Sequence, residues 1–294
     1  MKKQNAISRR GSLIQRLALA PYSVWAALFI VVPLFFVAYY AFTDASFHFT
    51  TRNITKFFTD TSRIADGEGF REVRTYLVIF GRSLKLAVIS TVICLVFGYP
   101  FAYMIARSSA RTQSILITII MIPMWMNFLI RTYAWMTILQ DTGLLLNFLR
   151  LLGFNMDNVH ITGTETAVVI GMVYDYFPYM ILPIYSIMAK MDVKLLEAAR
   201  DLGCDGFGVL RRVILPLSLP GVISGIIMVL IPSISTFYIS KILGNGLFPL
   251  IGDVIESQYQ NDPHFSSALA FILMVILLIA MALMQRFANK RAAA

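Results

Sequence analysis

The sequence predicts an all-α integral membrane protein, a bundle of six transmembrane helices with a short cytoplasmic helix between the fourth and fifth spans. Composition is the first observation behind this prediction: the 294 residues are 58% hydrophobic and only 14% charged, with a mean hydropathy of +0.72. A soluble domain carries roughly a quarter charged residues. The second observation is that apolar stretches of membrane-spanning length recur along the chain, so we expect a single transmembrane domain over residues 1–294.

Six stretches are long enough to cross a bilayer, whose hydrocarbon core of about 30 Å needs about 20 helical residues. They are Tyr22–Phe42, Leu84–Ala106, Ser114–Leu139, Thr166–Ala189, Val213–Ser240 and Phe265–Gln285. The first stretch is too long for the hydrophobic region of a cleaved signal peptide, and no clear small-x-small cleavage site follows it. We therefore interpret it as a retained span.

The distribution of basic residues predicts the orientation of these spans. Fifteen of the 25 Lys and Arg residues lie in the N-terminal tail, in the loop after the second span, in residues 190–212 and after the last span. The other ten lie on the opposite side, mostly in the long loop over residues 43–85, where charges influence orientation less. Because cytoplasmic loops carry the excess of Lys and Arg, we expect both termini and residues 190–212 to be cytoplasmic.

The sequence lacks the motifs of several enzyme classes. It contains no HExxH, no GxSxG, no phosphate-binding loop and no pair of acids inside the spans. His48, His160 and His264 fall in expected outer loops, and Cys94 and Cys204 have neither metal-site nor disulfide spacing. We therefore expect no catalytic residue, metal or cofactor in this chain. The net charge of +9 is explained by basic cytoplasmic loops, without a nucleic-acid partner.

Residues 190–212 form a charged segment between two apolar spans. Four apolar residues in it follow helical spacing and predict a short helix with one apolar face: Leu195, Leu196, Ala199 and Leu202. Gly203 follows where a helix C-terminus favours a residue that adopts a left-handed backbone conformation. A second short segment, Phe207–Arg212, leads into the fifth span. The simplest interpretation is a connector whose arginines extend to the membrane surface.

A longer pattern favours a more specific interpretation of this segment. An acid and two alanines, Glu197-Ala198-Ala199, are followed after three intervening residues by Gly203. After nine further residues come the apolar Val213 and then, one residue on, Leu215-Pro216. This arrangement resembles the EAA–x3–G–x9–I-x-L-P signature of the coupling loop of bacterial ABC importer permeases. Val213 in place of isoleucine is the one departure, and it preserves shape and apolarity.

The resemblance implies a type I importer permease whose coupling loop docks in a cleft of a separate ATPase subunit. Glu197 would be the polar anchor, Ala198 and Ala199 would allow close packing, and Gly203 would set the turn. The implied partners are a second homologous permease, two ATPase subunits that hold ATP and Mg, and an extracytoplasmic binding protein. A short stiff helix suits this role because it transmits a displacement that a loose loop would absorb.

Three further stretches resemble permeases of the spermidine/putrescine importer family, and among its two permeases most closely the first. They are Pro123–Leu149, Val173–Met188 and Phe237–Tyr259. This resemblance implies ATP-driven import of polyamines across a bacterial plasma membrane by alternating access. Two alternatives are an ABC importer for another solute and an ATP-independent channel or carrier; a membrane-embedded enzyme is disfavoured by the absent catalytic motifs.

A path for a polycation should offer carboxylates and aromatic faces. Asp175 lies inside the fourth span between Tyr174 and Tyr176, and an acid within a membrane span is a functional-site hypothesis. The alternative for Asp175 is an internal ion pair, for which Arg131 in the third span is available. Further candidate wall residues, each of which could instead pack in the core or anchor at the interface, are Trp125, Asn127, Tyr133, Trp135 and Tyr238.

Overall fold

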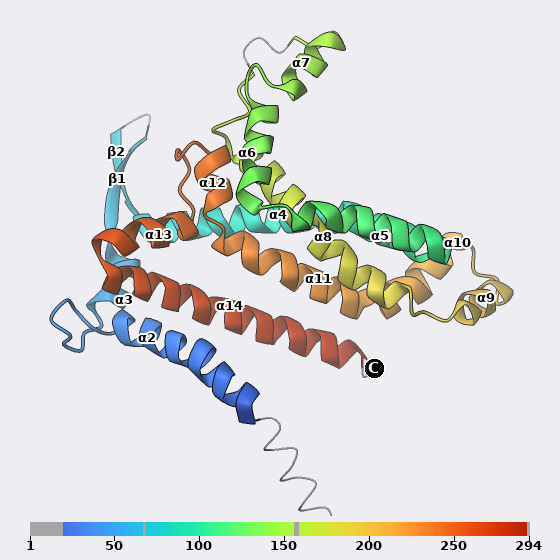
Figure 1. The fold of residues 1–294 in the computed structure, drawn as a ribbon, viewed down its shortest axis with the longest axis horizontal. Helices are drawn as coiled ribbons and strands as arrows, with labels where there is room; N and C mark the ends of the chain where they lie inside the picture. Colours follow the sequence, from blue (N-terminus) through green and yellow to red (C-terminus); the bar gives the residue numbers. More distant parts are fainter. Residues whose placement is uncertain (1–19, 67–68, 156–158, 293–294) are drawn as a thin grey trace, which may run out of the picture. The chain divides into compact units, whose positions relative to one another are not determined.

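The computed structural model describes residues 20–66, 69–155 and 159–292, and these residues are mainly helical (Figure 1). The predicted all-α membrane bundle is confirmed. Among the described residues, the extended structure consists of one antiparallel hairpin, β1 (Thr61–Asp66) with β2 (Gly69–Arg74), and one isolated bridge between Thr43 and Phe49.

The helices and strands follow one another along the chain with few long connections. In order they are η1 (Ala27–Val31), α2 (Val32–Ala41), α3 (Arg52–Thr59), β1, β2, α4 (Thr75–Ala106), α5 (Ala110–Trp125), α6 (Phe128–Leu139), α7 (Leu144–Leu151), α8 (Glu165–Met188), α9 (Val193–Asp201), α10 (Gly206–Val209), η2 (Leu210–Ile214), α11 (Leu215–Ser235), α12 (Tyr238–Leu243), α13 (Ile251–Asn261) and α14 (Pro263–Ala292).

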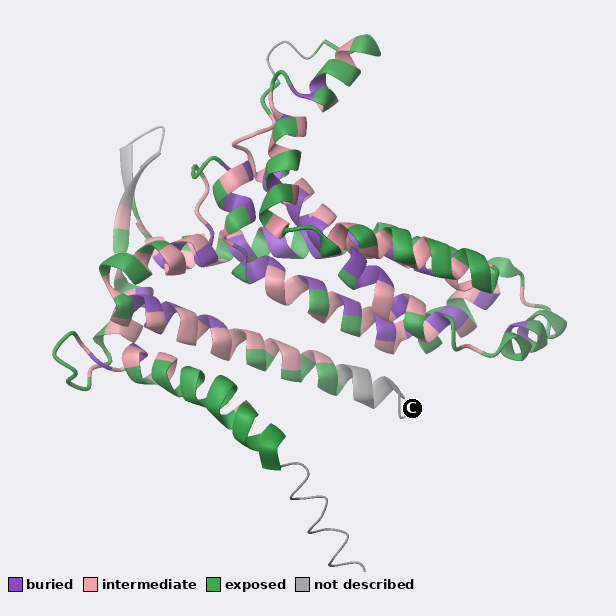
Figure 2. Ribbon diagram, in the orientation of Figure 1, coloured by how far each residue is buried: buried purple, intermediate pink, exposed green. Residues whose placement is uncertain are grey.

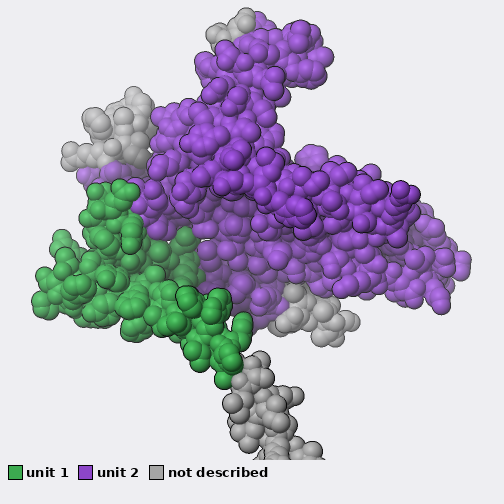
Figure 3. All heavy atoms as spheres, in the orientation of Figure 1, with its two compact units in different colours: residues 1–59, 258–274 green, residues 60–257, 275–294 purple. Residues whose placement is uncertain are grey.

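The described residues form two compact units, which are coloured separately in Figure 3. Unit 1 contains residues 20–59 and 258–274, and unit 2 contains residues 60–257 and 275–292. In unit 1, the rings of Phe42 and Phe271 meet edge to face at 5.5 Å, and Phe57 and Phe265 are buried. Within this unit, aromatic side chains therefore pack the residue that follows α2 against α14, and Lys56 of α3 lies over the Phe265 ring of α14.

The core of unit 2 is formed by α4, α8 and α11, which pack closely against one another. Small residues on α11 permit this approach: a Cβ atom at Gly225 would meet the Met180 sulfur at 2.8 Å, and one at Gly221 would meet the Pro183 carbonyl oxygen at 2.9 Å. A hydroxyl pair, Tyr99 Oη and Ser218 Oγ at 2.9 Å, links α4 to α11. Small residues and polar contacts of this kind hold helices together where lipid is the solvent.

Five helices in the described chain are long and apolar enough to cross a membrane: Ala20–Ala41, Thr75–Ala106, Glu165–Met188, Gly206–Ser235 and Pro263–Arg286. Figure 2 shows that much of α2 and α5 is exposed, whereas buried residues gather on α8 and its neighbours. Exposed apolar side chains such as Phe35 and Val96 are expected on helices surrounded by lipid.

The predicted third span, Ser114–Leu139, is not one continuous helix. The chain instead bends by 94° between Ala110–Trp125 and Phe128–Leu151, and a sixth span exists only if this bent pair crosses the membrane as one. The break has a local cause: Met126 has an extended backbone, and the Asn127 side chain accepts a hydrogen bond from the Leu129 N–H at 2.8 Å, which starts a new helix.

Two other predicted span boundaries also differ from the structure. The second span begins at Thr75 rather than Leu84, because the helix continues beyond its apolar part through charged residues such as Arg82. The fifth span ends at Ser235 rather than Ser240, because Thr236 is extended and α12 starts separately at Tyr238. Hydropathy locates the apolar part of a helix, while backbone hydrogen bonds determine where the helix ends.

Candidate coupling loop and transport pathway

The short helix α9 forms where the sequence predicts one, and both of its ends are capped. The Asp192 side chain accepts a hydrogen bond from the first turn. Gly203 has a φ of 83°, its N–H donates to the Arg200 carbonyl at 2.8 Å, and the Cys204 N–H donates to the Ala199 carbonyl at 3.1 Å. This pair of bonds is a Schellman motif, which favours glycine because the residue must adopt a left-handed backbone.

The apolar face predicted for this helix is only half covered by the chain. Leu196 and Ala199 are buried, but Leu195 is 50% exposed and Leu202 is 86% exposed. Phe207 on the neighbouring α10 is 68% exposed. Neighbouring exposed apolar side chains on a charged segment are typical of a surface that another protein covers.

Most residues of the coupling signature are exposed on this segment, including Gly203, and only Ala199 is buried. Glu197 and Ala198 are exposed, whereas Ala199 faces the interior of the chain. Leu215 and Pro216 are also exposed and lie in the first turn of α11. The residues predicted to contact the ATPase are therefore accessible, except for Ala199, whose small side chain packs inward.

The second part of the coupling segment, from Gly206, is continuous with the fifth span. The Asp205 side chain caps α10 by accepting a hydrogen bond from the Gly208 N–H at 2.8 Å. From Gly206 the chain forms one continuous helix through η2 and α11, and this helix ends at Ser235. A displacement applied near Phe207 would therefore pass directly into this span.

Inside unit 2, Asp175 on α8 forms a buried ion pair with Arg131 on α6. The Arg131 Nη1 atom lies 3.3 Å from Asp175 Oδ1, and their side chains are 10% and 3% exposed. Within the part of the chain that the structure describes, Arg131 Nε and Asp175 Oδ1 have no hydrogen-bond partner. Such an incompletely satisfied buried pair is weak evidence for a stabilising role.

The neighbours of Asp175 have different environments. Tyr176 is buried, and its hydroxyl donates to the Pro232 carbonyl on α11 at 3.4 Å. Tyr174 packs against Trp135 of α6 with ring centroids 5.1 Å apart. The rings of Tyr174 and Trp135 line an apolar cavity of about 420 Å³ bounded by α4, α6 and α8.

A second cavity, of about 360 Å³, contains two other candidate wall residues. Tyr133 on α6 and Tyr238 on α12 line it. Lys241 of α12 and Asn245 of the turn after α12 also line it, together with apolar residues of α6 and α12. The structure therefore places four of the predicted pathway residues in two cavities and Asp175 in a buried ion pair. Trp125 is 79% exposed and Asn127 caps α6, and neither side chain lines either of these two cavities.

The sequence interpretation did not place charged residues beside this second cavity. Lys241 lines it and pairs with Glu256 of α13 at 3.2 Å, and Asp253 of α13 lines a neighbouring cavity of about 210 Å³ with them. Burial raises the pKa of Asp253 above its usual value. The polar helix pattern of Ile251–Asn261, which follows α12, was the signal that could have placed these acids together on one helix.

Comparison with known proteins identifies the family. Residues 95–293 match the family described as "Binding-protein-dependent transport system inner membrane component". The chain is 36% identical over 285 residues to the spermidine/putrescine transport system permease protein PotB of Haemophilus influenzae, covering 94% of each protein. It is also 36% identical over 261 residues to PotB of Escherichia coli, covering 86% of this chain and 90% of that protein.

Solved structures share the fold at lower identity. The chain resembles a crystal structure of a bacterial ABC transporter involved in the import of the acidic polysaccharide alginate, with a TM-score of 0.74, 15% identity and 99% of each chain covered. This likeness concerns the fold alone. The family match and the two relatives show more: the chain belongs to the binding-protein-dependent transport system inner membrane components and is homologous to the PotB permeases, so it is a multi-pass inner-membrane transport subunit and not an enzyme.

Proposed function

We propose that this chain is the permease subunit of an ABC importer that moves polyamines such as spermidine or putrescine into the cell. The observation that carries the proposal is the 36% identity to PotB over 94% of the chain. The structure adds a capped helix, α9, with uncovered apolar side chains, which the turn at Gly203 connects to the helix that runs from Gly206 into a membrane span. This geometry suits a lever moved by an external subunit and offers no chemistry for bond breaking.

The proposed assembly contains a second homologous permease, two ATPase subunits and an extracytoplasmic polyamine-binding protein in a bacterial plasma membrane. ATP and Mg would bind to the ATPase subunits. The α9 surface with Glu197, Ala198, Leu195 and Leu202 would dock in the ATPase, and Gly203 would preserve the turn that presents it. Both chain termini and this surface would be cytoplasmic, as the distribution of Lys and Arg favours.

In the proposed pathway, substrate ammonium groups meet aromatic faces and carboxylates of unit 2. Tyr133 and Tyr238 line the cavity beside the Lys241–Glu256 pair, so protonated amines would find π faces and an acid within one region. Asp175 is occupied by Arg131 in this structure. A substrate amine would reach that carboxylate only after α6 moved relative to α8.

Reconstitution tests the proposal. The chain, its partner permease, the ATPase and the binding protein would be placed in liposomes, and ATP hydrolysis and uptake of labelled spermidine would be measured. We expect both to require the ATPase and the binding protein and to be stimulated by spermidine. ATP-dependent uptake of a different solute without any spermidine effect would contradict the substrate, and uptake without the ATPase would contradict the ABC mechanism.

A further inference from the structure

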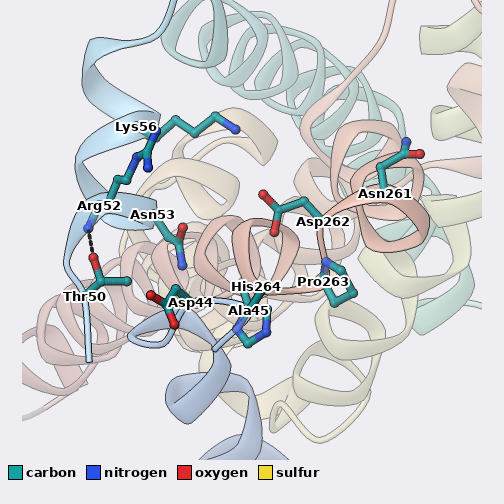
Figure 4. Close-up of a pocket in the computed structure, with 10 residues that line it drawn as sticks. All are labelled: Asp44, Ala45, Thr50, Arg52, Asn53, Lys56, Asn261, Asp262, Pro263 and His264. Atoms are coloured by element: carbon teal, nitrogen blue, oxygen red, sulfur yellow. Dashed lines mark hydrogen bonds between the residues drawn. The ribbon is translucent and has the colours of Figure 1, made fainter. Parts of the chain in front are cut away.

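Unit 1 contains a cavity that the proposed transport pathway does not use. Its volume is about 550 Å³. Figure 4 shows Arg52 and Lys56 of α3 along one side, and Asp262 at the turn into α14 on the other. Asp44 and His264 also line it. The question is which ligand would match this combination of charges.

The depth of the cavity relative to the membrane follows from the spans that border it. One apolar span, Ala20–Ala41, ends three residues before Asp44, and another, Pro263–Arg286, begins next to Asp262. The rings of Tyr40 and His264 lie 5.0 Å apart, so these two span ends are at the same level. Because the hydrocarbon core stops where the spans end, the cavity lies at the depth of the lipid headgroups.

Exposed aromatic side chains in the same loop support this placement. Phe47 is 57% exposed and Phe49 is 78% exposed, and both lie between α2 and α3. Aromatic residues are enriched at the level of the headgroups, where an apolar ring meets a polar environment. The loop that lines the cavity therefore has the character of an interfacial segment.

The two acids of the cavity are held in place by backbone groups. Asp44 Oδ1 accepts hydrogen bonds from the N–H groups of Ser46 and His48 at 3.0 and 2.9 Å, and the His48 N–H is the main reason that the pKa of Asp44 is lowered. Asp262 Oδ1 accepts the Phe265 N–H at 3.0 Å. In each case these hydrogen bonds use the Oδ1 atom, and Oδ2 can accept from a ligand.

The two bases face the same space without neutralising these acids. Among the described side chains, no ion pair joins Arg52 or Lys56 to Asp44 or Asp262. Lys56 Nζ lies 4.1 Å from the centre of the Phe265 ring. A guanidinium and an ammonium on successive turns of α3 match a phosphate group, because both donate charge-assisted hydrogen bonds.

We propose that this cavity binds the headgroup of a phospholipid that carries both a phosphate and a primary ammonium group, as phosphatidylethanolamine does. The phosphate would lie at Arg52 and Lys56, and the ammonium group at Asp44 and Asp262. An anionic headgroup would fit less well because it would face two carboxylates. A trimethylammonium headgroup would also fit less well because it donates no hydrogen bond to them.

Native mass spectrometry of the purified importer assembly tests this proposal. After delipidation, the assembly would be titrated with dioleoyl phosphatidylethanolamine, phosphatidylcholine or phosphatidylglycerol, and the bound fraction measured. We expect phosphatidylethanolamine to bind about tenfold more tightly than either other lipid, the ratio that a charge-assisted hydrogen bond typically supplies. Equal binding of the three lipids would overturn the proposal.

Paired variants assign the binding to this cavity. Asp44→Asn with Asp262→Asn retains the oxygen atoms that accept backbone N–H groups, and Asn is a good N-cap, so the fold should persist. We expect this double variant, and Arg52→Gln with Lys56→Gln, to weaken phosphatidylethanolamine binding about tenfold. Arg52→Lys with Lys56→Arg should retain binding, as should the control Asp141→Asn with Arg150→Gln in the loop around α7.

Three other outcomes would also overturn the proposal. Undiminished phosphatidylethanolamine binding by both paired variants would place the lipid elsewhere on the assembly. Soluble glycerophosphoethanolamine that competes as strongly as the lipid would show a site for a free solute. If the variants lost affinity for the extracytoplasmic binding protein while lipid binding stayed unchanged, the cavity would be a protein docking site.

Discussion

At the scale of single residues, the ion pair between Arg131 and Asp175 is the clearest test of the proposed pathway. Asp175→Asn by itself would leave Arg131 buried without its partner, which costs about 3–5 kcal/mol of stability. The double variant Asp175→Asn with Arg131→Met avoids this penalty. If Asp175 meets substrate, the double variant should assemble but show a KM for spermidine-stimulated ATP hydrolysis raised about tenfold.

The matched comparison is the reversed pair, Asp175→Arg with Arg131→Asp. It retains an ion pair between α6 and α8 but moves the carboxylate to the other helix. Wild-type kinetics in both double variants would show that the pair only packs the two helices together. A raised KM in both would support direct contact with the polyamine.

Gly203 tests the coupling loop. Its left-handed backbone costs other residues about 1–2 kcal/mol, but the structure leaves open space around a Cβ atom at this position. Gly203→Asp should therefore still insert in the membrane yet abolish transport, because it strains the turn and adds a charge to the docking surface. Gly206→Ala is the control, since Gly206 also has open space and no positive φ; transport by Gly203→Asp at the wild-type rate would refute the coupling role.

Asp253 predicts a pH dependence of stability. Burial raises its pKa in the folded protein, so the native state binds more protons than the unfolded state between the two pKa values. The stability should fall as the pH rises from the ordinary pKa of an aspartate to the raised one. Asp253→Asn retains an acceptor for the Leu250 N–H and should flatten this dependence in thermal unfolding scans at successive pH values; an unchanged slope would show that another group is responsible.

At the scale of elements, the break between α5 and α6 depends on a capping residue. Asn127 accepts the Leu129 N–H, and loss of such a cap costs about 1 kcal/mol. We expect Asn127→Ala to lower the free energy of unfolding by about this amount. Asn127→Asp preserves the acceptor and should behave as the wild type. If both variants unfold at the wild-type temperature, the cap contributes nothing to the bend.

At the scale of the whole molecule, the orientation can be tested with cysteine labelling. Cys204 lies in the coupling segment and is partly exposed, whereas Cys94 is buried inside unit 2. The reagent is a membrane-impermeant maleimide, added to cells whose outer membrane has been made permeable and whose inner membrane is intact. Under these conditions it should label the Ser46→Cys variant in a Cys204→Ser background. It should label Cys204 of the wild-type chain only after the cells are opened. The reverse pattern would place the α9 surface outside.

Local patterns in the sequence were sufficient for the helical membrane class, the approximate position of each span and the short helix α9. These features depend on the apolar length of a segment and on caps within a few residues, such as Asp192 and Gly203. The resemblance of the coupling signature and of three further stretches was also enough to indicate the family, which the comparisons confirm.

The tertiary structure alone decided how distant residues combine. It joined Asp175 to Arg131, placed four aromatic pathway candidates in two separate cavities, and brought Asp44 and Asp262 into one charged cavity. It also left Leu195 and Leu202 uncovered on a helix whose spacing predicted one apolar face. These outcomes depend on packing between segments far apart in the chain, where the direction of a helix after a break such as Met126–Asn127 determines which side chains meet.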